Sequence, residues 1–340
     1  MIQTSSTARS SFFALISLFI LGACNNGPAD KRIVRIDSVA NAAMAKEIEA
    51  SVTPTLAEGL SMRLWAVDSL VADPVSLDID DQGRLFYTRT NRQKNSEFDI
   101  RGHQDWEIGS IQLRNVEEKR AFLHKVLAPE LSAKNEWLKD LNGDGSHDWR
   151  DMTVEKEQIY RVEDKDGDGL ADFSQLVLED FNTEITDVAG AILAHDGDLF
   201  VGVGPDMWRV NDTDGDGLAD EKTSISHGYG IHVGFGGHGM SGAEVGPEGK
   251  IYWQIGDIGF SGEGPDGRKW EHPNSGVIVR ANRDGSDFEV FAYGNRNTHE
   301  FVFDEYGNLI SEDNDGDHRG EKERIVYITN GSDTGWRTNW

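Results

Sequence analysis

Residues 160–172 read YRVEDKDGDGLAD, and residues 208–220 read WRVNDTDGDGLAD. In both copies an aromatic residue, an Arg and a Val, typical of the end of a strand, lead into an acidic loop punctuated by glycines. The first aspartates of the two loops, Asp164 and Asp212, lie 48 residues apart (212 minus 164). A near-identical segment at this spacing predicts a repeat architecture in which each repeat is one supersecondary unit.

A second recurring element is Gly-x-(Leu/Ile) followed by Phe, Tyr or Ile, and an acidic turn precedes it. Its copies begin at Gly83, Gly197, Gly249 and Gly307, at intervals of 114, 52 and 58 residues. About 50 residues is the length of one four-stranded blade of a β-propeller. The 38 glycines and the short apolar runs also favour β structure. The sequence therefore predicts an all-β fold, a β-propeller of four-stranded blades with about four blades present.

The long first interval predicts an insertion in the propeller at about residues 91–158. Apolar residues recur there at roughly helical spacing, and Pro129 interrupts them. These residues are Phe122, Leu123, Val126, Leu127, Leu131, Trp137 and Leu138. Closed propellers usually have more than four blades, so we expect residues 52–340 to be an incomplete, C-terminally truncated propeller with a partly helical insertion.

The N-terminal residues predict export. An apolar run at 11–21 follows Arg9 and is short for a membrane span, as in a signal peptide. It ends in Leu21-Gly22-Ala23-Cys24, which resembles a bacterial lipobox, and Cys24 is the single cysteine of the chain. We therefore expect a lipoprotein signal peptide over 1–23, lipidation of Cys24, a tether over 24–51 and a lipid-anchored location in the bacterial cell envelope. An ordinary secretory signal is the alternative.

The formal net charge of −27 argues against nucleic acid or an anionic membrane surface as a partner. The acids gather instead in loops that carry oxygen ligands at alternate positions around a glycine turn. Close carboxylates repel by on the order of 1 kcal/mol per pair in water, and a calcium ion, which takes six to eight oxygens, reverses that balance.

The bidentate Glu that usually stands at position twelve of a calcium loop is missing, so we expect the residue at position nine to replace it in part. Solvated acidic turns are the alternative. The predicted calcium ligands are Asp140, Asn142, Asp144, Asp148, Asp164, Asp166, Asp168, Asp172, Asp212, Asp214, Asp216, Asp220, Asp313, Asp315, Asp317 and Glu321.

Residues 227–260 form a glycine-rich stretch that contains His227, His232 and His238. Their spacing differs from the i, i+4 pair of a helical zinc site, and no Cys is nearby, so ordinary loop histidines are favoured over zinc.

The blocks from about 230 to 337 resemble the soluble quinoprotein glucose/sorbosone dehydrogenases. They are HGMSG at 238–242, GPEGKIY at 246–252, IGD at 255–257, YGNRN at 293–297 and FDEYGNL at 303–309. The acidic loops upstream look more like a sister group, the putative membrane-bound dehydrogenase propellers. The chain departs from the quinoprotein pattern at Thr298, which stands where that family has Pro.

The resemblance implies a six-bladed family and oxidation of a sugar or polyol hydroxyl by hydride transfer to pyrroloquinoline quinone. It implies that His238 is the general base, that Asp257 orients it, and that Arg296 stabilises charge on the reduced quinone. The cofactor-binding residues would be Arg296, Asp313, Asn314 and Asp315. A cytochrome c electron acceptor is a further implied partner.

A non-catalytic propeller that binds glycans or a protein is the alternative function, with Trp208, Trp253 and Trp270 as sugar platforms or as blade core. The polar residues of the predicted site would then belong to the blade core. A hydrolase is the third and least favoured reading. Gly239-Met240-Ser241-Gly242 lacks the spacing of a nucleophile elbow, which argues against it.

Overall fold

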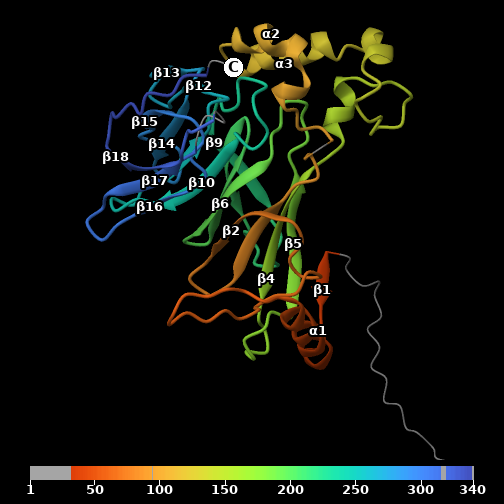
Figure 1. Ribbon diagram of the computed structural model, residues 1–340, viewed down its shortest axis with the longest axis vertical. Coiled ribbons are helices and arrows are strands. Elements are labelled where there is room, and N and C mark those ends of the chain that lie inside the picture. The colour runs from red at the N-terminus through yellow and green to blue at the C-terminus, as the bar shows by residue number, and fades with distance from the viewer. Residues whose placement is uncertain (1–31, 94, 315–318, 339–340) are drawn as a thin grey trace, which may run out of the picture. The chain divides into compact units, whose positions relative to one another are not determined.

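The structure is a computed structural model that describes residues 32–93, 95–314 and 319–338. The strands of these residues form four larger antiparallel sheets in chain order and a separate two-stranded sheet, β12-β13, and Figure 1 shows the strands following one another from β1 to β18. This arrangement confirms the predicted all-β, propeller-like fold with about four blades.

The first sheet has the order β1-β5-β4-β3-β2 and the second the order β6-β7-β8-β9. Their strands are β1 (Ile33–Arg35), β2 (Pro74–Ile79), β3 (Leu85–Arg89), β4 (Glu157–Glu163), β5 (Phe173–Asp180), β6 (Ala189–His195), β7 (Asp198–Val203), β8 (Asp206–Asn211) and β9 (Glu221–His227).

The third sheet has the order β10-β11-β14-β15, with the hairpin β12-β13 inserted, and the fourth the order β16-β17-β18. Their strands are β10 (Met240–Val245), β11 (Ile251–Ile255), β12 (Phe260–Glu263), β13 (Lys269–His272), β14 (Gly276–Ala281), β15 (Glu289–Asn295), β16 (Phe301–Phe303), β17 (Leu309–Asp313) and β18 (Arg324–Ile328).

Both sequence repeats have a fixed place in the sheets. Each Gly-x-(Leu/Ile) element forms the turn before the second meander strand of its sheet, at β3, β7, β11 and β17. Gly83, Gly197, Gly249 and Gly307 have φ between 77° and 84°, a conformation that favours glycine. The two best acidic loops join the third and fourth meander strands, β4 to β5 and β8 to β9. The repeat therefore reports blade geometry directly.

The strands β2, β6, β10 and β16 are the innermost ones, and each contacts the next (Figure 1). Strands β6 and β10 approach so closely that a Cβ atom on Gly190 would lie 2.0 Å from the carbonyl oxygen of Met240. The core lies between the sheets, and Trp253 and Phe200 are fully buried in it. Trp208 and Trp270 are partly buried and pack against core clusters.

The insertion lies between β3 and β4, within the first blade. Helix α3 (Val116–Val126) begins after Asn115, whose Oδ1 accepts a hydrogen bond from the amide of Glu118 at 2.9 Å, and it ends shortly before Pro129. The other helices are α2 (Glu107–Ile111) and the 3-10 helices Ile100–Gly102, Gln104–Trp106, Pro129–Lys134 and Trp149–Thr153. Apolar side chains of α3 and its neighbours form a small core of their own.

The predicted tether over 24–51 is wrong for its second half. Strand β1 pairs with β5, and helix α1 (Ser38–Ser51) follows it. Asp37 caps this Ala-rich helix, and Asn41 and Ala45 are buried against the first blade. The Nδ2 group of Asn41 donates to the carbonyl of Ala171, at 2.7 Å, in the acidic loop. Alanine favours helix, and the short side chains that suggest a linker in the sequence let this helix pack closely on the first blade.

The predicted signal peptide and Cys24 lie outside the described residues. Within residues 32–93, 95–314 and 319–338, no helix is both long and apolar enough to cross a bilayer.

Candidate active site

His238 stands directly before β10, at the end of the glycine-rich segment that connects the second and third blades. Its Nδ1 lies 2.7 Å from Oδ1 of Asp257, and both side chains are buried. Asp257 follows β11, so the turn at the end of this strand carries its carboxylate to the histidine. A carboxylate on Nδ1 favours the tautomer with its proton there, which leaves Nε2 to accept a proton.

Hydrogen bonds fix both the side chain and the backbone of Asp257. Its Oδ2 accepts from Nε1 of Trp336 at 2.7 Å, and its amide donates to the carbonyl of Arg296 at 2.7 Å. Its carbonyl accepts from the hydroxyl of Thr338 at 2.8 Å. The orientation of His238 is therefore fixed by segments from two blades and the C-terminal region.

Arg296 belongs to the same cluster of contacts. Its guanidinium lies over the rings of Phe235, at 5.6 Å, and Trp336, at 5.5 Å. The ring of Phe235 also packs edge-on against His238 at 5.5 Å. The structure thus brings together the three predicted catalytic residues, although Arg296 is only 2% exposed.

Asp313 positions this arginine. Its Oδ1 accepts from the amides of Arg296, at 3.0 Å, and Asn297, at 3.1 Å, and its Oδ2 accepts from Arg324 at 2.8 Å. Asn314 accepts from Nη1 of Arg296 at 2.6 Å. Both carboxylate oxygens of Asp313 thus accept hydrogen bonds from the chain, and its role as a calcium ligand stays a prediction from the sequence. The predicted ligands Asp315 and Asp317 lie outside the described residues.

Two cavities meet beside His238. The inner pocket has a volume of about 50 Å³ and is lined by residues that include His238, Lys119, Glu97 and Asp187. The axial cavity has a volume of about 520 Å³ and is lined by parts of the innermost strands β2, β6 and β10. The polar side chains around the axial cavity are those of Ser76, Thr90, Gln93, Glu97, Asp187, Ser241, His299 and Glu300.

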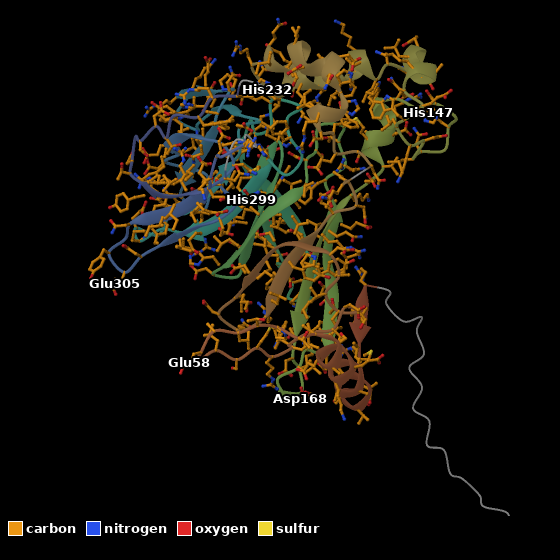
Figure 2. All side chains as sticks on the ribbon, viewed as in Figure 1. Glu58, His147, Asp168, His232, His299 and Glu305 are labelled. Atoms are coloured by element: carbon orange, nitrogen blue, oxygen red, sulfur yellow. The ribbon has the colours of Figure 1, made fainter. Side chains whose placement is uncertain are left out.

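The other two histidines of the glycine-rich segment have partners of their own. His232 is buried, with Nδ1 donating to the carbonyl of Ser110 at 2.6 Å and Nε2 beside Oδ1 of Asn274 at 2.9 Å. His227 pairs with Asp206 at 2.9 Å. Figure 2 shows His232 toward the insertion and apart from His299. No group of three metal-ligating side chains in the described part of the chain includes a histidine, so ordinary loop histidines remain the better interpretation.

Burial shapes the electrostatics of the inner pocket. It raises the pKa of Glu97 to about 7, with the charge of Asp187 acting in the same direction. It lowers the pKa of Lys119, whose Nζ donates to the carbonyl of Gly230 at 2.9 Å. Burial also lowers the pKa of His299, and the nearby His238 adds to that effect.

Sequence reasoning missed Glu97 and Lys119, because both belong to the insertion and to no recurring motif. One signal was available for Lys119. It lies on the apolar face of α3, four residues before the buried Leu123, and a lysine on such a face is a candidate for a buried functional group.

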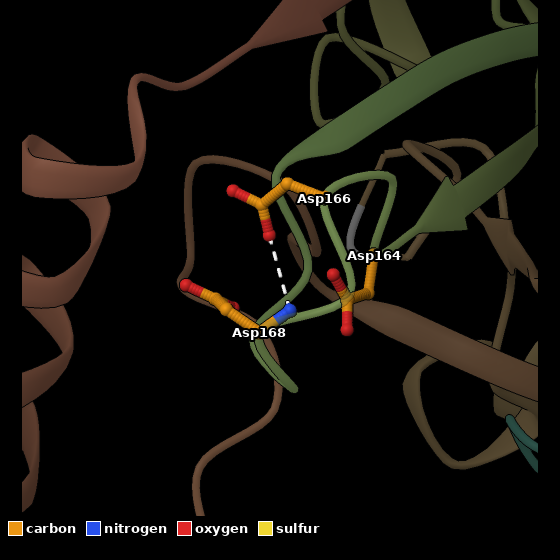
Figure 3. A group of neighbouring side chains, drawn as sticks. All are labelled: Asp164, Asp166 and Asp168. Atoms are coloured by element: carbon orange, nitrogen blue, oxygen red, sulfur yellow. Dashed lines mark hydrogen bonds between the residues drawn. The ribbon is translucent and has the colours of Figure 1, made fainter.

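The first acidic loop lies away from this site, as Figure 2 shows for Asp168 and His299. In the first loop, carboxylate oxygens of Asp164, Asp166 and Asp168 gather within 4.8 Å of one another (Figure 3), and Asp212, Asp214 and Asp216 do the same in the second. These donor sets fit a hard cation with oxygen ligands.

The ninth positions of these loops do not join the gathered oxygens. Oδ1 of Asp172 accepts from the amide of Lys165, and Oδ2 of Asp220 accepts from the amide of Thr213, each at 2.8 Å. The expectation that position nine replaces the missing bidentate Glu is therefore not supported, because these carboxylates close the loop instead.

The third loop has the same turn but a different use of its acids. Asp140 accepts from the amides of Gly143 and Gly145, as Asp164 does from Gly167 and Gly169. Here Arg150 lies 3.2 Å from Asp144 and 2.6 Å from Asp148. The predicted calcium ligand Asp148 is instead a buried cap of the helix Trp149–Thr153, so a cation is already supplied by the chain.

A tricarboxylated quinone does not fit the described residues. Such a cofactor needs cationic partners, whereas the axial cavity is lined by Glu97, Asp187 and Glu300 and by no Lys or Arg of the described chain. Lys119 lines only the small inner pocket, and Arg296 lines neither cavity. The predicted contacts of Arg296, Asn314 and Asp313 with a quinone are therefore replaced by contacts among themselves.

Comparison with known proteins finds one family model, whose description assigns no function. The family model described as Domain of unknown function (DUF7133) matches residues 47–332. Among curated proteins, none matches the chain.

Several solved structures are similar to part of the chain. One is the PQQ-bound aldose sugar dehydrogenase of Streptomyces coelicolor, with 15% identity and a TM-score of 0.34 over 53% of this chain and 60% of that one. The PQQ domain of a pyranose dehydrogenase from Coprinopsis cinerea has 15% identity and a TM-score of 0.33 over 50% of this chain and 45% of that one.

A protein of unknown function from Dyadobacter fermentans has 9% identity and a TM-score of 0.37 over 78% of this chain and 67% of that one. The chain thus spans 60% or less of the length of the two dehydrogenase structures.

Proposed function

The chain belongs to the DUF7133 family, whose description assigns no activity, and we propose from its own site that it is a dehydrogenase-like propeller acting on a sugar or polyol. The ligand binds in the axial cavity with one hydroxyl group extending into the inner pocket, where His238 removes its proton. The observation that carries this proposal is the buried His238–Asp257 pair, 2.7 Å apart, whose histidine lines a pocket that adjoins the axial cavity.

Each residue of the site has a role that its contacts support. A neutral imidazole with Nδ1–H on a carboxylate presents Nε2 as a proton acceptor. Asp257 keeps this tautomer and stabilises the imidazolium that forms after proton transfer. Trp336 and Arg296 hold Asp257 in place. The hydroxyl and amide side chains of the axial cavity supply donors and acceptors for a polyhydroxyl ligand.

Oxidation of a hydroxyl also requires an acceptor for two electrons. The sequence resemblance implies pyrroloquinoline quinone, but the described residues do not fit it, so no step is assigned to that group. What this chain contributes under the proposal is ligand binding and the proton transfer.

The test combines binding and turnover. Titration calorimetry with a panel of aldoses and polyols identifies the ligand, and dye reduction is then measured with and without added calcium and pyrroloquinoline quinone. We expect Asp257→Asn and His238→Ala to lower kcat by about 10²- to 10⁴-fold while ligand affinity changes little.

Asp206→Asn is the matched control, because it breaks a second His–Asp pair, with His227 at 2.9 Å, whose histidine is exposed and which lines neither cavity. Turnover that is equal in wild type and Asp257→Asn would refute the role of the pair.

Glycan binding without chemistry is the second candidate, and the acid-lined cavity without a cationic partner for a quinone favours it. Ligand binding with no turnover under any acceptor would establish this alternative. Trp253 is core and is therefore no sugar platform.

We also propose that calcium stabilises the first two acidic loops, on the strength of their gathered carboxylates. Export, lipid anchoring at Cys24 and electron transfer to a cytochrome c stay predictions from the sequence. Mass spectrometry of the membrane fraction would test the anchor, since loss of the lipid mass in Cys24→Ser is expected.

A further inference from the structure

The insertion contributes the walls of the active site. The amide of Ile100 donates to the carbonyl of Gly234 at 2.9 Å, and Ser110 exchanges two hydrogen bonds with the backbone of Val233. Asp99 accepts from the amide of Gly236 at 3.1 Å, and Glu97 accepts from the amide of Gly237 at 3.0 Å. Residues 97–110 therefore hold the segment that ends in His238.

Glu97 has a second position in the site. Among the described residues, Glu97, Asp187 and Gly239 line both the inner pocket and the axial cavity. The backbone of Gly239 lies close to the carboxylate of Asp187, because a Cβ atom on this glycine would lie 2.8 Å from Oδ2 of Asp187. Glu97 and Asp187 are thus the ionisable groups at the junction between the pocket of His238 and the larger cavity.

The surroundings of Glu97 favour proton exchange. Oε1 of Glu97 accepts one backbone hydrogen bond, and no ion pair engages this carboxyl within the described residues. Burial and the neighbouring carboxylate of Asp187 raise its pKa to about 7, so both of its protonation states are accessible near neutral pH. The ionisable groups around it are Asp99, Lys119, Glu157, Glu184, Asp187, His232, His238, His299 and Glu300.

We propose that Glu97 is the proton-transfer partner of His238, and that it passes the proton between the inner pocket and the axial cavity. The identity of the proton donor, a ligand hydroxyl, rests on the proposed function. The proton path between His238 and Glu97 does not. The hydroxyl proton of the ligand moves to Nε2 of His238, and from there, through water in the inner pocket, to the carboxyl of Glu97. Glu97 then releases it to water in the axial cavity, beside Asp187, and returns to the carboxylate.

Lys119 supports this path as a positioning residue. Its Nζ is fixed on the carbonyl of Gly230, and a Cβ on Gly230 would lie 3.6 Å from that nitrogen and 3.9 Å from Oδ2 of Asp187. Burial raises the pKa of Glu97 to about 7, so Glu97 is the member of the pair to which we assign the gain and loss of the proton.

The test uses the full chain and a readout that does not require turnover. The imidazole resonance of His238, assigned by its absence in His238→Ala, is followed by NMR between pH 5 and 9. In wild type we expect the chemical shift to change in two steps, and the second inflection reports the ionisation of Glu97. In Glu97→Gln the second inflection should disappear, because the amide keeps the acceptor for the amide of Gly237 but cannot ionise.

Glu300→Gln is the matched control, since Glu300 lines the axial cavity but not the inner pocket. We expect its His238 titration to match that of wild type. A curve for Glu97→Gln that is also identical to wild type would overturn the proposal, as would the loss of the second inflection in Glu300→Gln but not in Glu97→Gln.

Thermal unfolding of each variant shows whether it is folded. If Glu97→Gln unfolds, Glu97→Asp is used, because a shortened carboxyl should move the second inflection and leave the fold intact. Where turnover is found, Glu97→Gln should lose the limb of the pH–rate profile near pH 7 and keep KM. Absence of turnover in wild type with an unchanged NMR result would reject the proposed function and leave this proton path standing.

Discussion

At the scale of single residues, Glu97 links the pH of the solution to the stability of the fold. Its pKa is raised from 4.5 to about 7 by burial and by Asp187. Between these two values the folded state binds more protons than the unfolded state, so the free energy of unfolding falls as pH rises through this window. Below about pH 4.5 the contribution of Glu97 is fully present, and above about pH 7 it is lost.

Glu97→Gln should therefore flatten the pH dependence. We expect the difference in urea midpoint between pH 5 and pH 7.5 to be smaller in this variant than in wild type, with wild type relatively more stable at pH 5. Urea unfolding at both pH values measures it. A parallel change in the two proteins would show that Glu97 titrates at its ordinary pKa when folded.

The predicted and the missed residues of the site differ in how far apart the interacting segments lie in sequence. His238, Asp257 and Arg296 could be found because each lies in a short block of sequence that resembles the quinoprotein dehydrogenases. Glu97 lies 141 residues before His238 (238 minus 97), and the packing of an irregular insertion brings it to the amide of Gly237, beside that histidine. No local pattern encodes such a contact.

At the scale of elements, the three acidic loops offer an internal comparison. The first two present gathered carboxylates, whereas Arg150 already neutralises the third. Calcium at about ten times its dissociation constant should add about 1.4 kcal/mol per site to the free energy of unfolding, and chelation should remove that gain. Thermal unfolding with calcium and with a chelator measures the effect as a shift of a few degrees.

Substitutions can localise the calcium response. Asp168→Asn combined with Asp216→Asn should abolish it, because the amide retains the hydrogen bond to the following amide group but loses the charge. Asp144→Asn should leave the calcium response as in wild type. A response that disappears with Asp144→Asn instead would place the ion in the third loop.

Helix α1 shows how composition alone misleads. Its Ala-rich sequence resembles a linker, yet it buries Asn41 on the acidic loop of the first blade. Asn41→Ala leaves the carbonyl of Ala171 without this donor and should lower the free energy of unfolding by about 1–3 kcal/mol. Lys46→Ala, at an exposed position of the same helix, should change it by less than about 0.5 kcal/mol. Denaturant unfolding of both variants would show equal stability if the segment were a tether.

At the scale of the whole molecule, the sequence predicted the blades well because a blade is a local meander, with turns and strands that recur at a fixed length. The spacing between blades could not be predicted in this way, because it depends on contacts between the innermost strands of separate sheets. Gly190 is one such contact, and nothing in the repeat distinguishes it from other glycines.

Gly190→Ala tests how tightly neighbouring blades pack. Its Cβ would lie 2.0 Å from the carbonyl oxygen of Met240, and this backbone atom cannot move without shifting β10. Overpacking of this kind destabilises by about 1–3 kcal/mol or more, and here it should also weaken ligand binding, because Gly190 lines the axial cavity. Gly102→Ala is the control, since nothing lies within 4 Å of its added methyl group, and its urea midpoint should stay close to that of wild type. If the two variants unfold at the same urea concentration, β6 and β10 are farther apart in solution than this structure has them, and the axial cavity is wider.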